Sequence, residues 1–158
     1  MKMPVTTRLA TTDDLHPLAQ LFDQYRQFYD CDSDLEAAHH WLKTNMQQRR
    51  SVIFVALSDE TMLGFTQLYP ALCSVDLVDY FVLYDLFVMN TARRTGVGRS
   101  LMLAASDWAT QQGAARLDLE TARDNHAGQA LYHSLGYQRD EVFLKYSLDL
   151  SRLRNSSA

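Results

Sequence analysis

One short segment combines two glycines with two arginines at the point where an apolar run gives way to an amphipathic pattern. It reads Arg93-Arg94-Thr95-Gly96-Val97-Gly98 and follows the apolar run Tyr80–Val88. Glycine leaves backbone amides accessible, and the N-terminus of a helix carries partial positive charge, so such amides bind phosphate groups. Arginine adds charged donors for the same anion. The segment therefore predicts a site for a phosphate or diphosphate group.

Two common phosphate-binding motifs do not match this segment. A P-loop has lysine and then serine or threonine after its last glycine, whereas Gly98 is followed by Arg99 and Ser100. A dinucleotide-binding motif has a third glycine where this sequence has Leu101. The alternative is that the glycines only form a turn between a strand and a helix.

Two carboxylates stand where acid–base chemistry could use them. Asp85 is the one charged residue in the run Tyr80–Val88, and it needs a partner because burying an unpaired carboxylate is costly. Glu120 is expected at the carboxyl end of a strand, where open α/β sheets bind ligands. For each, the alternative is a structural ion pair. A base for an ammonium group also needs a pKa raised by burial.

Two segments together resemble the GNAT N-acetyltransferases. Arg93-x-x-Gly96-x-Gly98 after a strand is similar to the acetyl-CoA signature of that superfamily. The segment Asn125–Tyr137 (NHAGQALYHSLGY) resembles its second hallmark, N-x-x-A/G-x-x-L-Y-x-x-x-G-F/Y. The resemblance covers roughly residues 5–149 and is sharpest over Tyr84–Tyr137. The segment Leu83–Val88 resembles the corresponding sequence of a bacterial GNAT subgroup called histone-acetyltransferase-like.

The resemblance implies transfer of an acetyl group from acetyl-CoA to a primary amine by direct attack in a ternary complex. It implies that Tyr132 protonates the leaving thiolate and that Glu120 or Asp85 is the base, and the sequence leaves both carboxylates open. Packing is the alternative for Tyr132, and capping a helix is the alternative for Asn125. An amide near Val88 would serve as the oxyanion donor. The implied cofactor contacts are Phe87, Val88, Met89, Arg93, Arg94, Thr95, Gly96, Val97, Gly98, Arg99, Ser100, Asn125, Gly128 and Tyr132.

Acidic residues favour a cationic acceptor. The segment Asp30–Glu36 has four acids in seven residues, and in GNAT enzymes the segment after the first helix overhangs the acceptor pocket. The alternative is a solvated turn in which Ser33 or Asp34 caps the next helix. A small cationic amine, such as a polyamine or an amino-acid derivative, is therefore the expected substrate. The implied substrate contacts are Asp32, Asp34, Tyr84, Asp85 and Glu120.

Two other functions remain open. One is acetylation of a peptide N-terminus or a protein lysine. The other is a non-catalytic module that binds or senses acyl-CoA, which would need Arg93, Gly96 and Gly98 but neither Glu120 nor Tyr132. The sequence does not predict a metal site, because Glu36 and His39-His40 do not have the spacing of a zinc motif.

Composition indicates one globular domain. The chain has 158 residues, 47% apolar and 22% charged, which suits a domain over residues 1–150 followed by a polar tail over 151–158. The net charge of −4 argues against binding of nucleic acid or an anionic membrane. The apolar region Val75–Met89 contains three aspartates and is not expected to cross a bilayer. Cys31 and Cys73 form no CxxC pair, which favours a reducing compartment and a cytoplasmic location.

Hydrophobic periodicity predicts the elements that position these residues. We expect an α/β GNAT fold with a mixed, mostly antiparallel sheet of six to seven strands and about four helices. GNAT proteins often dimerise, sometimes through their last strands, so a homodimer through Val142–Leu148 is also expected. The predicted helices include 15–29, 97–111 and 125–135, and one ends near Arg49. The predicted strands are Val5–Ala10, Ser51–Leu57, Met62–Tyr69, Tyr80–Val88, Arg116–Thr121, Tyr137–Arg139 and Val142–Leu148.

Overall fold

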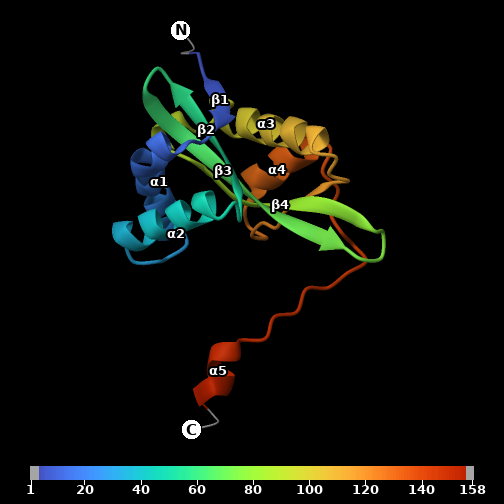
Figure 1. The fold of residues 1–158 in the computed structure, drawn as a ribbon. Helices are drawn as coiled ribbons and strands as arrows, with labels where there is room; N and C mark the ends of the chain where they lie inside the picture. Colours follow the sequence, from blue (N-terminus) through green and yellow to red (C-terminus); the bar gives the residue numbers. More distant parts are fainter. Residues whose placement is uncertain (1–3, 156–158) are drawn as a thin grey trace. The chain divides into compact units, whose positions relative to one another are not determined.

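Strands from the first 120 residues form a single sheet (Figure 1). The computed structural model describes residues 4–155, and the chain divides into one unit ending at Glu120 and a second beginning at Thr121. Within the described residues the sheet order is β1-β2-β3-β4-β5, antiparallel as far as β4 and parallel between β4 and β5. The strands are β1 (Thr6–Leu9), β2 (Val52–Ser58), β3 (Thr61–Cys73), β4 (Val78–Val88) and β5 (Leu117–Asp118).

Helices of the first unit cover both faces of this sheet. Ile53 of β2 packs in one hydrophobic core with Leu18 and Leu42, which come from two different helices. The next residue, Phe54, faces the other way, and its ring centroid lies 6.1 Å from that of Trp108. Side chains alternate between the faces of a strand, which explains the two layers. The helices are α1 (Leu15–Phe28), α2 (Leu35–Gln47) and α3 (Val97–Gln111), with short 3-10 turns η1 (Thr12–Asp14) and η2 (Asn90–Ala92).

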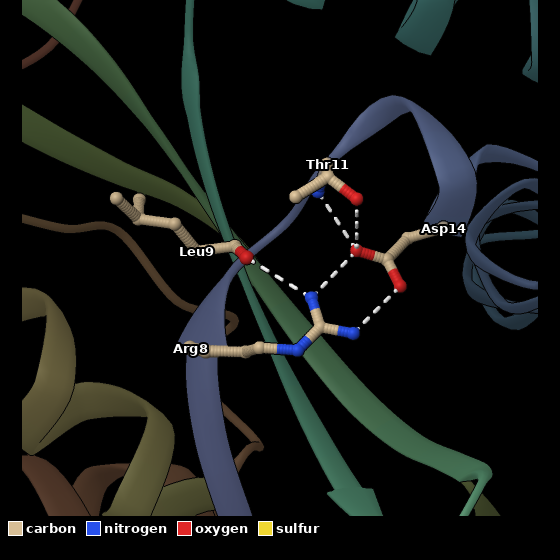
Figure 2. A network of polar contacts seen from close by, with 4 residues as sticks. All are labelled: Arg8, Leu9, Thr11 and Asp14. Atoms are coloured by element: carbon tan, nitrogen blue, oxygen red, sulfur yellow. Dashed lines mark hydrogen bonds and ion pairs between the residues drawn. The ribbon is translucent and has the colours of Figure 1, made fainter.

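A buried carboxylate fixes the entry to α1 (Figure 2). Both guanidinium Nη atoms of Arg8 donate to the two oxygens of Asp14, at 2.7 and 2.9 Å. The backbone N–H of Thr11 donates to the same carboxylate at 2.7 Å, which completes a capping box. The hydrogen bond from Arg8 holds the pKa of Asp14 below its ordinary value, although burial acts against it. Asp14 therefore has its cation supplied by the chain itself.

The ladder between β3 and β4 sets the course of the strand that carries Asp85. Gln67 lies opposite Asp85, and a bulge follows at Leu68. Near the other end of β4, Gly64 pairs with Val88, and a Cβ at position 64 would lie 2.7 Å from the Phe87 carbonyl oxygen. Only glycine permits this approach of the two backbones.

The second unit contains two described helices, α4 (His126–Ser134) and α5 (Leu150–Asn155). The first confirms the helix predicted over 125–135. The second covers most of the predicted polar tail 151–158, of which residues 156–158 lie outside the described residues. None of the described helices combines the length and the apolar content that crossing a bilayer requires.

The predicted final hairpin is wrong for the described residues. No strand forms over 137–149, and the backbone amides of Val142 and Phe143 instead donate to Asp140 Oδ1 at 2.8 and 3.2 Å. Alternating apolar residues predict extended backbone, but they do not specify a pairing partner. The apolar side chains of this segment are each at least 71% exposed: Val142, Phe143, Leu144, Tyr146 and Leu148.

The fold class is confirmed and the strand count is corrected. The protein has an α/β fold with a mixed, mostly antiparallel sheet, as predicted. Among residues 4–155 the sheet has five strands rather than six or seven, because the hairpin is missing, and there are five α-helices rather than about four.

Candidate functional site

Asp85 is buried on β4, and its hydrogen-bond donors among the described residues are neutral. Its side chain is 5% exposed. Gln67 Nε2 donates to its Oδ2 at 2.8 Å, and the phenol of Tyr25 from α1 also hydrogen-bonds to it. No arginine or lysine among the described residues forms an ion pair with it. Burial raises the pKa of Asp85, and the hydrogen bonds from Gln67 and Tyr25 only partly oppose that effect.

A polar network behind Asp85 holds the Gln67 amide in position. Gln67 Oε1 accepts from Ser51 Oγ at 2.6 Å and from Asn45 Nδ2 at 3.3 Å. With its oxygen occupied in this way, the amide presents its nitrogen to Asp85. The Oδ1 atom of Asn45 is buried and has no hydrogen-bond partner among the described residues. Ser51 and Asn45 therefore hold the Gln67 amide in the orientation from which it donates to Asp85.

Tyrosines lie beside Asp85 on the α1 and α2 side of the sheet. Burial raises the pKa of Tyr25, and the charge of Asp85 raises it further. Burial also raises the pKa of Tyr69, again with a contribution from Asp85. The ring of Tyr84, a predicted substrate contact, stands edge-on to the ring of Tyr69, with centroids 5.6 Å apart. Asp85 thus lies among phenols from one helix and two strands.

The turn before α3 has the conformation that the glycine pattern predicted. Gly96 is the N-cap of α3 with φ +92°, and no side chain caps the helix. The first α-helical backbone bond runs from Ser100 N to Gly96 O at 3.0 Å, so the amides of Val97 and Gly98 precede the intrahelical ladder. Arg94 adopts a positive φ of 60° and is exposed. Amides at a helix N-terminus beside an arginine fit a diphosphate group.

Arg93 has contacts that the sequence did not predict. Its Nε donates to the Val88 carbonyl oxygen at 3.0 Å. Its guanidinium carbon lies 5.6 Å from the ring centroid of Phe87 and 5.7 Å from that of Phe28. The side chain therefore ties the end of β4 to the end of α1. Thr95 closes the same turn by donating its hydroxyl to Ala92 O at 2.6 Å.

The edge of β4 next to the turn has no strand beside it in the described part of the chain. β5 pairs with β4 at Phe81 and Val82 and not beyond. On the opposite edge, Met89 N donates to Leu63 O of β3 at 2.8 Å. Amides alternate between the two edges of a strand, so the Val88 amide points away from β3. This is the amide for which the resemblance implied a catalytic role.

The acidic turn before α2 uses its charges structurally. Asp34 caps α2 by accepting from Ala37 N at 3.0 Å. Buried Asp23 accepts from Ser33 Oγ at 2.7 Å and from Asp34 N at 2.8 Å, and these bonds, led by the one from Ser33, lower the pKa of Asp23. Asp32 is exposed. The capping interpretation of the sequence describes this turn well.

Glu120 lies two residues beyond β5 and is exposed. The predicted strand Arg116–Thr121 is reduced to Leu117–Asp118, so Glu120 is outside the sheet. Asp85, in contrast, is buried and lies within β4.

The second unit places three predicted residues on or beside α4. Asn125 caps this helix by accepting from Gly128 N at 3.1 Å, and its Nδ2 donates to Thr121 Oγ1 at 2.9 Å. A Cβ at Gly128 would collide with the Asn125 amide, so the room left by this glycine is occupied by the cap. Tyr132 is half-buried, with its ring centroid 6.1 Å from that of Tyr137. Burial raises the pKa of Tyr137 to about 12.

Comparison with known proteins decides the family. Residues 15–137 match the model of the acetyltransferase (GNAT) family. The chain belongs to the GNAT acetyltransferases. Enzymes of this family use acetyl-CoA as the acetyl donor.

Individual GNAT relatives match along most of the chain. A Bacillus subtilis (strain 168) protein called uncharacterized N-acetyltransferase YhfO is 42% identical over 143 residues, which cover 90% of this chain and 96% of the relative. A probable acetyltransferase from Haemophilus influenzae is 29% identical and covers 87% and 93% of the two chains. A solved structure described as a probable acetyltransferase aligns with a TM-score of 0.85 at 36% identity, over 93% of this chain and 97% of the other.

These findings confirm the GNAT fold and the N-acetyltransferase activity that the sequence predicted. The histone-acetyltransferase-like subgroup stays a prediction. Residues 4–155 contain no cluster of three or more side chains that could hold a metal ion.

Sequence reasoning missed two residues of the site, Gln67 and Tyr25. Gln67 is a polar residue inside the apolar strand 62–69, and the same argument that singled out Asp85 could have found it. Tyr25 lies on α1, and the sequence analysis gave it no role in the site. Its contact with Asp85 depends on how α1 lies on the sheet, which the sequence does not specify.

Proposed function

We propose that this GNAT enzyme transfers an acetyl group from acetyl-CoA to the primary amine of a small cationic metabolite, by direct attack in a ternary complex. The observation that carries the proposal is Asp85, a buried carboxylate with neutral donors and no cation from the described chain. A substrate ammonium would supply that missing charge. Polyamines and amino-acid derivatives are the metabolites first expected to offer it.

Residues of the turn and of α3 would hold the acetyl-CoA, which supplies an activated acetyl group when bound. The uncapped first-turn amides of α3, with Gly96 as N-cap, suit its diphosphate, and exposed Arg94 adds positive charge. The outward Val88 amide is available to pantetheine or to the reacting carbonyl oxygen. The contacts proposed for Asn125 and Gly128 have less support, because each group has a structural role at the start of α4.

Asp85 rather than Glu120 is the proposed base. An ammonium group must lose its proton before it attacks, and a carboxylate removes it better when its pKa is raised toward the working pH. Burial raises the pKa of Asp85, whereas Glu120 is exposed. Asp85 would bind the ammonium first and then take its proton, directly or through a water molecule.

Tyr132 is the proposed acid for the leaving thiolate. The support is its match to the motif tyrosine of the family and its position on α4, one turn after Gly128. Its proton would neutralise the sulfur as the bond to the acetyl group breaks. Tyr132→Phe is expected to lower turnover by about 10²- to 10⁴-fold with little change in coenzyme A affinity, the usual worth of a general acid.

Two measurements test the proposal. Calorimetric titration with coenzyme A should show binding, and an assay of thiol release over a panel of small primary amines should show transfer. The absence of coenzyme A binding would overturn the proposal. Turnover only on peptides would favour the alternative, an N-terminal or lysine acetyltransferase. Binding without transfer to any amine would favour an acyl-CoA sensor.

A cytoplasmic homodimer completes the proposal. The exposed apolar segment Val142–Leu148 supports a dimer, because a second copy of the chain would remove these side chains from water. Cys31 and Cys73 are free thiols, in keeping with a reducing compartment. Analytical ultracentrifugation checks the dimer: a monomer at all concentrations would contradict it.

A further inference from the structure

We infer that the acceptor of this enzyme is an arylalkyl monoamine, a primary amine with one ammonium group on a short linker to an aromatic ring. The inference rests on the proposed function, since it names the class of amine that Asp85 receives. The deciding observation is a connected set of aromatic side chains around that carboxylate, with an arginine at each end. We call this set the aromatic arc, and its members are Trp41, Tyr69, Tyr84, Tyr25, Tyr29 and Phe28.

Contacts between side chains hold each half of the arc together. On one side of Asp85, Trp41 hydrogen-bonds to the phenol of Tyr69, and Tyr69 and Tyr84 have ring centroids 5.6 Å apart. On the other side, the centroids of Tyr25 and Tyr29 are 5.2 Å apart, and those of Tyr29 and Phe28 are 5.4 Å apart. The halves meet at Tyr25, which hydrogen-bonds to Asp85 and lies close enough to Tyr84 for the two phenols to interact electrostatically.

Several rings of the arc are exposed to solvent. Tyr84 is 66% exposed, Phe28 64% and Tyr29 56%. Contiguous exposed apolar side chains in a folded domain mark a binding surface. Aromatic rings bind other rings edge-on or offset, and they also attract cations over their faces. The arc therefore suits a ligand with a flat apolar body and a positive charge.

The arc surrounds one buried carboxylate. Asp85 is the carboxylate that hydrogen-bonds to a member of the arc. The nearby acids Asp23 and Asp34 already hold the turn before α2 and cap that helix. An extended polyamine carries several ammonium groups, and Asp85 can pair with one of them.

Arginines at both ends of the arc exclude further positive charge. The Arg50 guanidinium lies 5.2 Å from the Trp41 ring centroid, and that of Arg93 lies 5.7 Å from the ring of Phe28. Like charges repel, and this repulsion is strong where water is partly excluded. A polyamine that extends from Asp85 along the arc to either end would bring its second ammonium group to one of these arginines. A neutral aromatic ring has no such conflict.

Competition among amines tests the inference. The probes are 2-phenylethylamine, spermidine and ethylamine, each measured for kcat/KM in acetyl transfer. We expect 2-phenylethylamine to exceed spermidine by at least about 10-fold, because the ring adds contacts with the arc and the extra ammonium groups lose affinity. A higher kcat/KM for spermidine would overturn the inference and leave the proposed function intact.

A pair of variants on one strand locates the effect. Tyr84→Leu removes a ring of the arc, while Tyr80→Leu removes a tyrosine of β4 outside it. Tyr84→Leu should raise KM for 2-phenylethylamine about 3- to 10-fold more than for ethylamine, and Tyr80→Leu should change both equally. An equal effect of Tyr84→Leu on the two amines would contradict a role of the arc in specificity.

Calorimetry without turnover separates this inference from the proposed function. With coenzyme A present, 2-phenylethylamine should bind, and 2-phenylethanol, which lacks the ammonium group, should bind at least about 10-fold more weakly. If the protein binds coenzyme A but not 2-phenylethylamine, the inference fails alone. If it binds both but transfers nothing, the catalytic proposal fails, and the arc is supported only as a binding site for the amine.

Discussion

Two buried aspartates of the first unit have nearly equal exposure and opposite electrostatic surroundings. Asp14 is 7% exposed and Asp85 is 5% exposed. Asp14 receives both Nη atoms of Arg8 and the amide of Thr11, and its pKa is lowered. Asp85 receives the neutral donors Gln67 and Tyr25, and its pKa is raised. For this pair the sign of the shift follows the hydrogen-bond donors that each carboxylate receives, and Arg8 is the largest cause at Asp14.

The difference separates a structural carboxylate from one that can serve a substrate. The chain supplies the counter-charge of Asp14, so this group holds the entry to α1 and needs nothing further. Asp85 is a buried charge without a counter-ion. Such a charge destabilises the folded protein and gives the fold no benefit. A bound ammonium would remove that cost. Asp14 and Asp85 should then respond in opposite ways to the same substitution.

The largest effect is expected from Asp85→Asn. The amide keeps the shape and most hydrogen bonds of the carboxylate but cannot accept the ammonium proton, so turnover should fall about 10²- to 10⁴-fold. The melting temperature should stay equal or rise, since a buried unpaired charge is removed. Steady-state kinetics and thermal unfolding measure the two effects. The control is Asp79→Asn, an exposed aspartate of the same strand, and equal activities of the two variants would refute the role of Asp85.

Asp14→Asn should give the opposite pattern. It breaks the bidentate pair with Arg8 and should destabilise the protein by about 1–3 kcal/mol, with turnover of the folded enzyme unchanged. Urea unfolding of this variant beside Asp13→Asn, at an exposed neighbouring position, measures the effect. Loss of activity without loss of stability would contradict the structural role of Asp14.

Gln67→Leu should act through Asp85. Without the donated hydrogen bond at 2.8 Å, the pKa of Asp85 should rise further, and turnover at pH 7 should fall about 10-fold, as for loss of a hydrogen bond to a charged group. The acidic limb of the pH–rate profile should move to higher pH, which a purely structural role would not cause. Ser51→Ala removes only the outer bond of the network and should leave that limb in place.

The smallest effects concern the pH dependence of stability. The folded-state pKa of Asp14 is lowered, so its stabilising contribution is present above the unfolded pKa of about 3.9 and is lost as the pH falls through the folded value. The folded-state pKa of Asp85 is raised, so ionisation of Asp85 destabilises the protein above that value, and protonation in acid removes this destabilisation.

Lowering the pH should therefore reduce the difference in free energy of unfolding between the wild type and each variant, Asp85→Asn or Asp14→Asn. In Asp85→Asn the variant is the more stable partner at pH 7, and in Asp14→Asn the wild type is. Chemical unfolding at a series of pH values checks both signs, and a gap that widens in acid would contradict the assignment.

The sequence predicts local structure in this chain better than it predicts contacts. Asp85 was identified because it is the one charged residue in the run 80–88. The glycine spacing predicted where α3 begins. Both depend on the order of neighbouring residues along one segment. The contact between Tyr25 and Asp85 joins residues 60 positions apart, and it requires α1 to lie on β4.

The predicted final hairpin is a second case in which the sequence does not specify a contact. Alternation over 142–148 predicts extended backbone, and pairing needs a partner strand that alternation does not name. Arg93 is a third example: the sequence gives its charge, but its contacts with Val88, Phe87 and Phe28 depend on the fold.

One NMR titration tests the central claim most directly, because it follows the carboxyl carbons of Asp14 and Asp85 in the same sample. We predict that Asp85 titrates above the ordinary aspartate pKa of about 3.9 and Asp14 below it. Adding the acceptor amine should then lower the pKa of Asp85 and leave Asp14 unchanged. An Asp85 that titrates at or below Asp14, or that ignores the amine, would contradict the account.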